Sequence, residues 1–163
     1  MSKIGIFYGS STGTTEDIAK RIAEQLGVES DDIYDVADAD ASDADAYDIL
    51  LLGSSTWGDG ELQDDWYDFL EELKGHLNGK KVGVFGTGDS DSYGDSFCDA
   101  VGLIYNEVSG CGCTMIGSMP TDGYNYEESQ AEKDGHFVGL LIDEVNEDDQ
   151  TDDRIATWVK TLK

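Results

Sequence analysis

The chain has 163 residues and a formal net charge of −26, because 36 Asp and Glu residues face only 10 Lys and Arg. This charge makes nucleic acid and anionic membranes poor partners and favours the basic faces of other proteins. The chain has no secretory signal pattern and no apolar run of about 18 residues, so we expect a cytoplasmic protein that does not span a membrane. The length predicts one domain, 1–163. The acidic excess is also compatible with a high-salt host.

Apolar, strand-like runs alternate with amphipathic, helix-like runs along the chain. The strand-like runs are 3–8, 32–36, 48–53, 81–86 and 114–119, and the run 137–142 continues the last of them after a polar excursion, 120–136. The helix-like runs carry apolar residues at spacings of three and four over 18–26, 66–77, 97–108 and 155–162, the last capped by Thr151. Five β-α units in succession predict an α/β fold with a doubly wound parallel sheet.

Polar loops follow three of the predicted strands. They cover residues 9–15, 54–62 and 87–96, and all are rich in glycine and in hydroxyl or acidic residues. In doubly wound sheets, ligands bind at the carboxyl ends of the strands. We therefore expect the three loops to converge on one site.

The first loop is dominated by hydroxyl side chains. Residues 10–15 are five Ser or Thr residues and one glycine, placed between a strand and a helix. Backbone N–H groups and the helix dipole favour an anion there, and hydroxyls add donors without charge. The loop has neither the lysine of a nucleoside-triphosphate loop nor the G-x-G-x-x-G pattern of dinucleotide sites. A phosphate monoester fits it, although an ordinary Ser/Thr helix cap remains the simpler alternative.

The other two loops each carry an aromatic residue, Trp57 and Tyr93, among polar neighbours. Two such rings at adjacent strand ends could hold a flat ring between them, although they could also simply cover the edge of the sheet. A phosphate and a flat ring together indicate a mononucleotide, and loops this acidic suit an uncharged ring.

The chain resembles the flavodoxin family over almost its whole length. The similarity rests on FYGSSTGTTE at 7–16, TWGDGELQDDW at 56–66, FGTGD at 85–89 with YGDSF at 93–97, and the segment 121–144. It implies a five-stranded sheet of order 2-1-3-4-5, non-covalently bound FMN and one-electron transfer between redox proteins. The excursion that interrupts the fifth strand resembles the long-chain subfamily, and we take it as a candidate surface for partner docking.

The resemblance also implies roles for particular residues. It places the phosphate on Ser10, Ser11, Thr12, Gly13, Thr14 and Thr15. The ribityl chain and the flavin ring would lie along Thr56, Trp57 and Gly58, with Tyr93 stacked on the outer face of the ring. The polar edge of the ring would meet Asp89 and the backbone of Thr87 and Gly88. The remaining candidates for the cofactor site are Ser55, Asp59, Gly60 and Asp95.

The turn Trp57-Gly58-Asp59-Gly60 suggests how the protein tunes FMN. One-electron reduction with proton uptake adds an N–H at ring atom N5, which a backbone carbonyl could accept if the peptide after Gly58 turns over. The acidic loops disfavour the anion formed by the second electron, so we expect cycling between semiquinone and hydroquinone at low potential.

The leading hypothesis is therefore a monomeric electron carrier that is not itself an enzyme and has no catalytic residues or metal. The alternative is a flavin-dependent NAD(P)H:quinone reductase on the same fold. A phospho-receiver domain is rejected, because the strand ends at 8–10 and 53–55 lack carboxylates. His76 and His136 stand apart from the three loops, and Cys98, Cys111 and Cys113 are expected to be free thiols without an assigned role.

Overall fold

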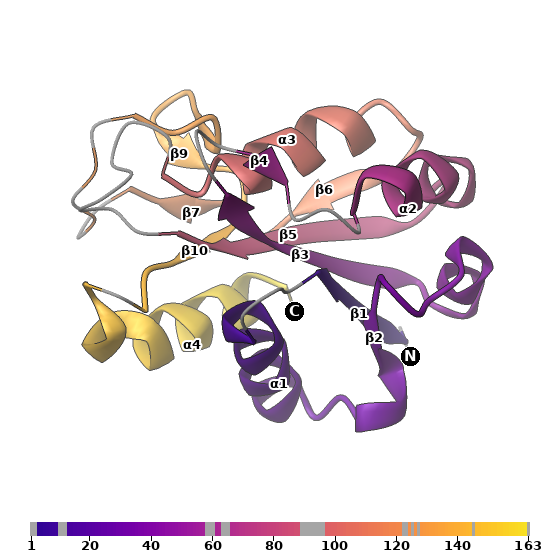
Figure 1. Cartoon of the computed structure of the whole chain (residues 1–163), viewed down its shortest axis with the longest axis horizontal. Helices are drawn as coiled ribbons and strands as arrows, with labels where there is room; N and C mark the ends of the chain where they lie inside the picture. Colours follow the sequence, from indigo (N-terminus) through magenta and orange to yellow (C-terminus); the bar gives the residue numbers. More distant parts are fainter. Residues whose placement is uncertain are drawn as a thin grey trace.

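The computed structural model describes residues 3–9, 13–57, 61–62, 66–88, 97–121, 124, 126, 128–144 and 146–162, with only the backbone described at 56–57 and 61–62. Its centre is a parallel sheet that runs through the middle of the molecule (Figure 1). The main strands, in spatial order, are β2 (Ile33–Asp35), β1 (Ile4–Gly9), β3 (Ile49–Trp57), β5 (Lys81–Thr87) and β10 (Leu140–Ile142). This arrangement confirms the expected order 2-1-3-4-5.

The fifth position of the sheet is shared by two short strands. β6 (Thr114–Ile116) pairs with the first half of β5, and β10 pairs with its second half at Phe85–Thr87. Between them the chain forms a small antiparallel sheet of β7 (Met119–Pro120), β9 (His136–Phe137) and β8 (Glu132–Lys133). The expected interruption is confirmed, but the run 137–142 is not one strand. Gly139 separates β9 from β10 where a Cβ atom would lie 2.0 Å from the carbonyl oxygen of Val84, so only glycine allows this approach.

The α-helices cover both faces of the sheet (Figure 1). α1 (Thr14–Leu26) and α4 (Thr151–Thr161) lie on one face, and α2 (Trp66–Leu73) and α3 (Asp99–Val108) lie on the other. The helix expected from residue 66 continues after α2 as a short 3₁₀ segment, η3 (Lys74–His76). α3 begins later than expected, at Asp99, because Cys98 adopts a left-handed conformation with φ 51°.

The connection between β2 and β3 corrects the expected pattern of five β-α units. It contains a 3₁₀ helix, η2 (Ala41–Ala46), in place of an α-helix. Ala41 and Ala44 are buried, a spacing of three that matches the 3₁₀ repeat. The Asp40 and Asp43 side chains close a capping box around its first turn. Two further 3₁₀ turns, η1 (Ser30–Asp32) and η4 (Asp148–Gln150), precede β2 and α4.

Thr151 does not cap the last helix. It is the first helical residue of α4, the cap position is Gln150, and no side chain there accepts a helix N–H. The Thr151 hydroxyl, almost fully buried, instead donates to a carboxylate oxygen of Glu144 at 3.2 Å. The threonine therefore ties α4 to the segment that follows β10.

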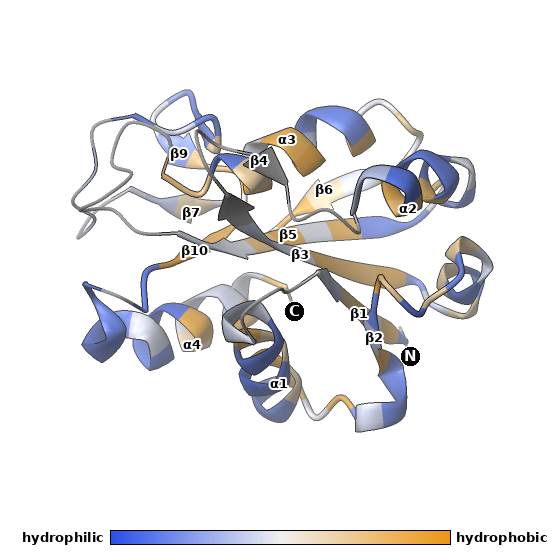
Figure 2. Cartoon of the chain, viewed as in Figure 1, coloured by the Kyte–Doolittle hydropathy of each residue, from blue (hydrophilic) through white to orange (hydrophobic). Residues whose placement is uncertain are grey.

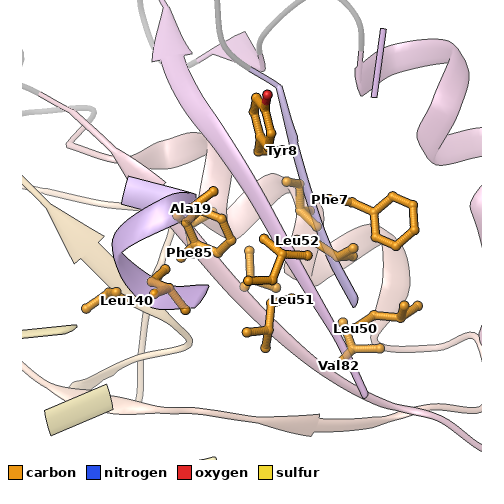
Figure 3. Close-up of a cluster of buried hydrophobic side chains, with 14 of the residues drawn as sticks. Phe7, Tyr8, Ala19, Leu50, Leu51, Leu52, Val82, Phe85 and Leu140 are labelled. Atoms are coloured by element: carbon orange, nitrogen blue, oxygen red, sulfur yellow. The ribbon is translucent and has the colours of Figure 1, made fainter. Parts of the chain in front are cut away.

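Side chains from the sheet fill a core on both of its faces. Leu50, Leu51 and Leu52 of β3 are completely buried, as a strand covered on both faces requires. Figure 3 shows Phe7 and Phe85 on opposite sides of β3, and the two rings pack against Phe69 of α2 and Trp158 of α4 respectively. The polar faces of the helices point outward, while the strands are largely apolar (Figure 2). In the part of the chain that is described, no helix is both long and apolar enough to cross a membrane.

Candidate functional site

The carboxyl ends of three adjacent strands form the edge at which the site lies. In the sheet register, Gly9 of β1 pairs with Ser54 of β3, and Ser55 of β3 pairs with Thr87 of β5. Ser54 and Thr87 are buried, and the Ser54 hydroxyl donates to the carbonyl of Ser55 at 2.8 Å. The three loops predicted to converge therefore leave the sheet side by side.

α1 begins directly beside this edge, and its first turn has the backbone form expected at an anion site. Gly13 takes the cap position with φ 90°, a left-handed conformation that disfavours any residue with a Cβ atom. Among the described residues, a Cβ atom built on Gly13 would meet nothing within 4 Å. α1 therefore starts at a glycine whose backbone conformation other residues rarely adopt.

Thr15 and Thr87 connect this helix to the sheet. Their hydroxyl oxygens lie 3.0 Å apart, and both side chains are buried. The contact joins residues predicted in two different loops and fixes the start of α1 against the end of β5. The expectation that the Thr15 hydroxyl also reaches a phosphate stays a prediction.

The second loop begins within a short hairpin. β3 extends beyond the predicted strand as far as Trp57 and pairs there with β4 (Glu61–Leu62) in antiparallel register. Residues 58–60 lie between these two strands in the sequence. The indole N–H of the buried Trp66 donates to the carbonyl of Gly53 at 2.7 Å and anchors the start of α2 to β3. This hydrogen bond holds α2, which follows the hairpin, against β3.

Both ends of the third loop are held by the excursion or by β10, the strand that follows it. At the first end, the N–H of Gly88 donates to the carbonyl of Ile142 at 3.0 Å. At the second end, the N–H of Phe97 donates to the carbonyl of Glu128 at 3.2 Å, and the buried Ser129 hydroxyl donates to the carbonyl of Phe97. Ser129 was not among the predicted site residues, since an isolated serine in a polar segment carries no sequence signal of this contact.

Charged groups near the start of α1 are paired locally. Lys20 contacts Glu16 at 2.8 Å, and this hydrogen bond lowers the pKa of Glu16. Burial, together with the nearby Glu16 carboxylate, raises the pKa of Tyr8 at the end of β1 to about 12, so this phenol is neutral at physiological pH. Near the start of α1, Lys20 is therefore paired with a carboxylate and the side chain of Tyr8 carries no charge.

The structure brings together part of the predicted set. Gly13, Thr14, Thr15, Ser55, Thr87 and Gly88 lie at the same edge, and the backbone of Thr56 and Trp57 continues from it. The other candidates lie outside the described residues: Ser10, Ser11, Thr12, Gly58, Asp59, Gly60, Asp89, Tyr93 and Asp95. Their roles stay predictions.

The histidines take no part in the described portion of the site. His76 lies in η3, just before β5 begins, with its Nδ1 atom 3.0 Å from a carboxylate oxygen of Asp45. His136 lies in β9 of the small antiparallel sheet. Within the described ranges, no group of three or more His, Cys, Asp or Glu side chains is arranged to hold a metal ion.

A doubly wound parallel sheet with helices on both faces defines an α/β protein, a class in which ligands bind at the carboxyl edge of the sheet. The chain belongs to the flavodoxin family, whose family model matches residues 6–158. It is 48% identical to Flavodoxin 1 of Azotobacter vinelandii and 48% identical to a flavodoxin of Synechococcus elongatus. Each alignment covers 100% of this chain and 97% of the relative. The crystal structure of Fusobacterium nucleatum flavodoxin bound to flavin mononucleotide is 33% identical, with a TM-score of 0.90 over 99% of this chain and 97% of that one.

Proposed function

We propose that this protein is an electron carrier that binds FMN without a covalent bond and serves other redox proteins. The observation that carries the proposal is the position of the N-terminus of α1 beside the carboxyl ends of β1, β3 and β5, where the Thr15 and Thr87 hydroxyls lie 3.0 Å apart. Membership in the flavodoxin family and the flavin mononucleotide in the Fusobacterium nucleatum structure support the same cofactor.

The described residues fit FMN. An anion is favoured at a helix N-terminus, and α1 begins with the left-handed Gly13 at the carboxyl edge of the sheet. The predicted hydroxyls at 10–15 would supply further donors, and Trp57 and Tyr93 would supply the ring contacts. FMN itself would supply the electron chemistry, and the protein would position and tune it.

The redox part of the proposal concerns which oxidation states the protein favours. We propose low-potential cycling between the semiquinone and hydroquinone states of FMN, supported by the density of acidic residues in the loops at this edge. We also propose that the peptide after Gly58 turns over and that its carbonyl then accepts a hydrogen bond from the N–H at ring atom N5. A state is favoured only when the protein interacts with it more strongly than with its competitor.

The proposal extends to partners and setting. The net charge of −26 favours docking on basic faces of reductases and oxidoreductases, in encounters that weaken with salt. The small sheet of β7, β8 and β9 supports assignment to the long-chain subfamily and is available for partner docking. We propose a cytoplasmic, single-domain monomer that carries out no substrate turnover of its own.

The test of cofactor binding compares FMN with riboflavin, which lacks the phosphate. Apoprotein is titrated with each flavin, and binding is followed by quenching of flavin fluorescence. We expect riboflavin to bind at least about a hundredfold more weakly, because loss of two hydrogen bonds to a charged group, about 1.5 kcal/mol each, costs about 3 kcal/mol. Equal affinities would refute the phosphate site.

The test of the redox proposal is a spectroelectrochemical titration of the FMN-loaded protein. We expect a blue neutral semiquinone to accumulate during partial reduction and to persist until a distinctly lower second potential. Reduction in a single two-electron step would contradict one-electron cycling. Turnover of quinone by NAD(P)H with the purified protein alone would favour the reductase alternative.

A further inference from the structure

Three sulfur-containing residues lie where α3 ends and the fifth strand position begins. They are Cys111, Cys113 and Met115, spaced as C-x-C-x-M. Cys113 Sγ lies 3.8 Å from Met115 Sδ. Cys113 directly precedes β6, and alternate residues of an extended segment point to the same side, which explains why these two sulfurs meet.

A tight turn separates Cys111 from Cys113. Gly112 has φ 83°, and its carbonyl accepts the N–H of Gly79 at 2.9 Å. A Cβ atom on Gly112 would lie 2.4 Å from the side-chain oxygen of Asn78, so the turn needs glycine both for its backbone conformation and for this close approach. The turn that separates the two cysteines is therefore fixed by packing.

Both thiols point at the last turn of α3. The Cys111 S–H donates to the carbonyl of Glu107 at 3.4 Å, and the Cys113 S–H donates to the carbonyl of the next residue, Val108, at 3.1 Å. The two thiols therefore approach successive carbonyls in one turn of α3. The C-terminal end of a helix carries partial negative charge, which favours a cation at this position.

The cluster is both accessible and partly shielded. Cys111, Cys113 and Met115 are half-buried, and all three pack against the hydrophobic core. Burial, and to a smaller extent the neighbouring Cys111, raises the pKa of the Cys113 thiol. A metal ion that binds thiolate strongly would displace the thiol protons on binding.

We propose that Cys111, Cys113 and Met115 form a binding site for one soft monovalent metal ion, Cu(I) or Ag(I). Thiolate and thioether are the ligands that such ions prefer. No described group of three or more His, Cys, Asp or Glu side chains completes a site for a harder ion here. Binding replaces two S–H protons by one M⁺, releases two H⁺ and leaves a thiolate complex of charge −1, without change of oxidation state.

This site is separate from the proposed flavin site. β6 pairs with the first residues of β5, Lys81–Gly83, whereas the flavin edge lies at the other end of β5, at Thr87. The metal site therefore goes beyond the proposed function, and loss of one should leave the other intact.

The experiment uses reduced, FMN-loaded protein under anaerobic conditions. Cu(I) is supplied as its complex with bathocuproine disulfonate, and bound copper is measured by elemental analysis after desalting. We expect one Cu(I) per chain. Each of Cys111→Ser and Cys113→Ser should lower the affinity by more than about a hundredfold, above the range for loss of an outer-shell partner. Met115→Leu should lower it by about tenfold, at the low end of that range.

Two control variants remove sulfur atoms that lie outside the proposed metal site. Cys98→Ala removes a thiol that is completely buried elsewhere, and Met119→Leu removes a buried thioether in β7. Both should retain full Cu(I) binding, and all variants should retain FMN and the parent circular dichroism spectrum. A titration with Ag(I) in chloride-free buffer should give the same stoichiometry and the same losses.

Three outcomes would overturn the proposal. The parent could fail to take Cu(I) from the chelator, or the two serine variants could bind as much metal as the parent. Thiol titration after copper treatment could also show two thiols lost with no bound metal, which would indicate a disulfide. A parent protein that fails to bind FMN would contradict the proposed function but not the metal site, because copper binding is measured separately.

Discussion

The hydroxyl oxygen of Thr15 lies 3.0 Å from that of Thr87, and both side chains are buried. This single contact joins the first turn of α1 to the last residue of β5. The two elements are far apart in the sequence, with β2, β3 and α2 between them. It explains how the start of the helix is held at the edge where the three loops emerge. Its strength can be measured directly, because threonine and valine have nearly the same shape.

Replacing one partner of this pair should destabilise the protein more than replacing both. Thr15→Val or Thr87→Val leaves the other hydroxyl buried without this partner, which should cost about 1–3 kcal/mol. The double variant should lose clearly less than the sum of the single variants. Urea unfolding of the apoproteins provides the double-mutant cycle, and additive losses would show that the two hydroxyls do not interact.

Gly13 and Gly27 provide a matched test of the helix N-terminus. They flank α1 at its two ends, both have positive φ, and a Cβ atom on either would meet nothing within 4 Å. Each substitution to alanine should therefore cost about 1–2 kcal/mol of stability through backbone strain. Only Gly13→Ala should also weaken FMN binding, measured by fluorescence titration. Equal FMN affinity for the two variants would place the phosphate elsewhere.

Ser129 should support the flavin site from outside it. Its hydroxyl donates to the carbonyl of Phe97, the residue at which the third predicted loop ends. Ser129→Ala should cost about 1 kcal/mol of stability and weaken FMN binding, because this end of the loop loses its anchor. Thr157→Ala is the control, since its exposed hydroxyl donates to the carbonyl of Asp153 in α4. If both variants bind FMN like the parent, the anchor is irrelevant to the site.

Gly58 should set the first reduction potential. Gly58→Val would resist the backbone rotation proposed after this residue, at about 1–2 kcal/mol of strain. We expect the oxidised/semiquinone potential to become more negative in the variant, while the second potential changes less. Spectroelectrochemistry of the parent and variant measures both potentials. An unchanged first potential would mean that Gly58 only shapes the turn.

Salt should stabilise the protein. At a net charge of −26 the folded chain repels itself, and this repulsion is screened as the Debye length falls to about 3 Å near 1 M salt. Melting temperatures measured in increasing potassium chloride should rise steeply at first and then level off. Sucrose serves as a control for effects unrelated to charge. A flat curve in salt would remove both the repulsion argument and the suggestion of a high-salt host.

Periodicity was enough to predict the α/β class and the doubly wound parallel sheet, and the family resemblance supplied the strand order. The continuous apolar run at 48–53 could only be a strand covered on both faces, and it became the centre of β3. The polar excursion at 120–136 had no core-forming pattern, which is why its interruption of the fifth strand could be predicted. The glycine- and hydroxyl-rich loops predicted a site at the carboxyl edge, because parallel strands place these ends together.

Other features depended on contacts between distant segments. The 3₁₀ form of η2 depends on two buried alanines that meet the rest of the fold, and the split between β9 and β10 depends on Gly139 approaching Val84. Thr151 looks like a helix cap in sequence but finds its partner in Glu144. Local propensity predicts none of these features, because each depends on which distant residue the segment contacts in the folded chain.

The same distinction runs through the site. Sequence alone identified which residues carry hydroxyls, glycines and sulfurs, because those are properties of side chains and spacing. The pairing of Thr15 with Thr87 and the anchoring of Phe97 by Ser129 required the tertiary structure. Hydrogen bonds and metal sites depend on distances of a few ångströms, and for residues far apart in sequence only the packing of the folded chain sets those distances.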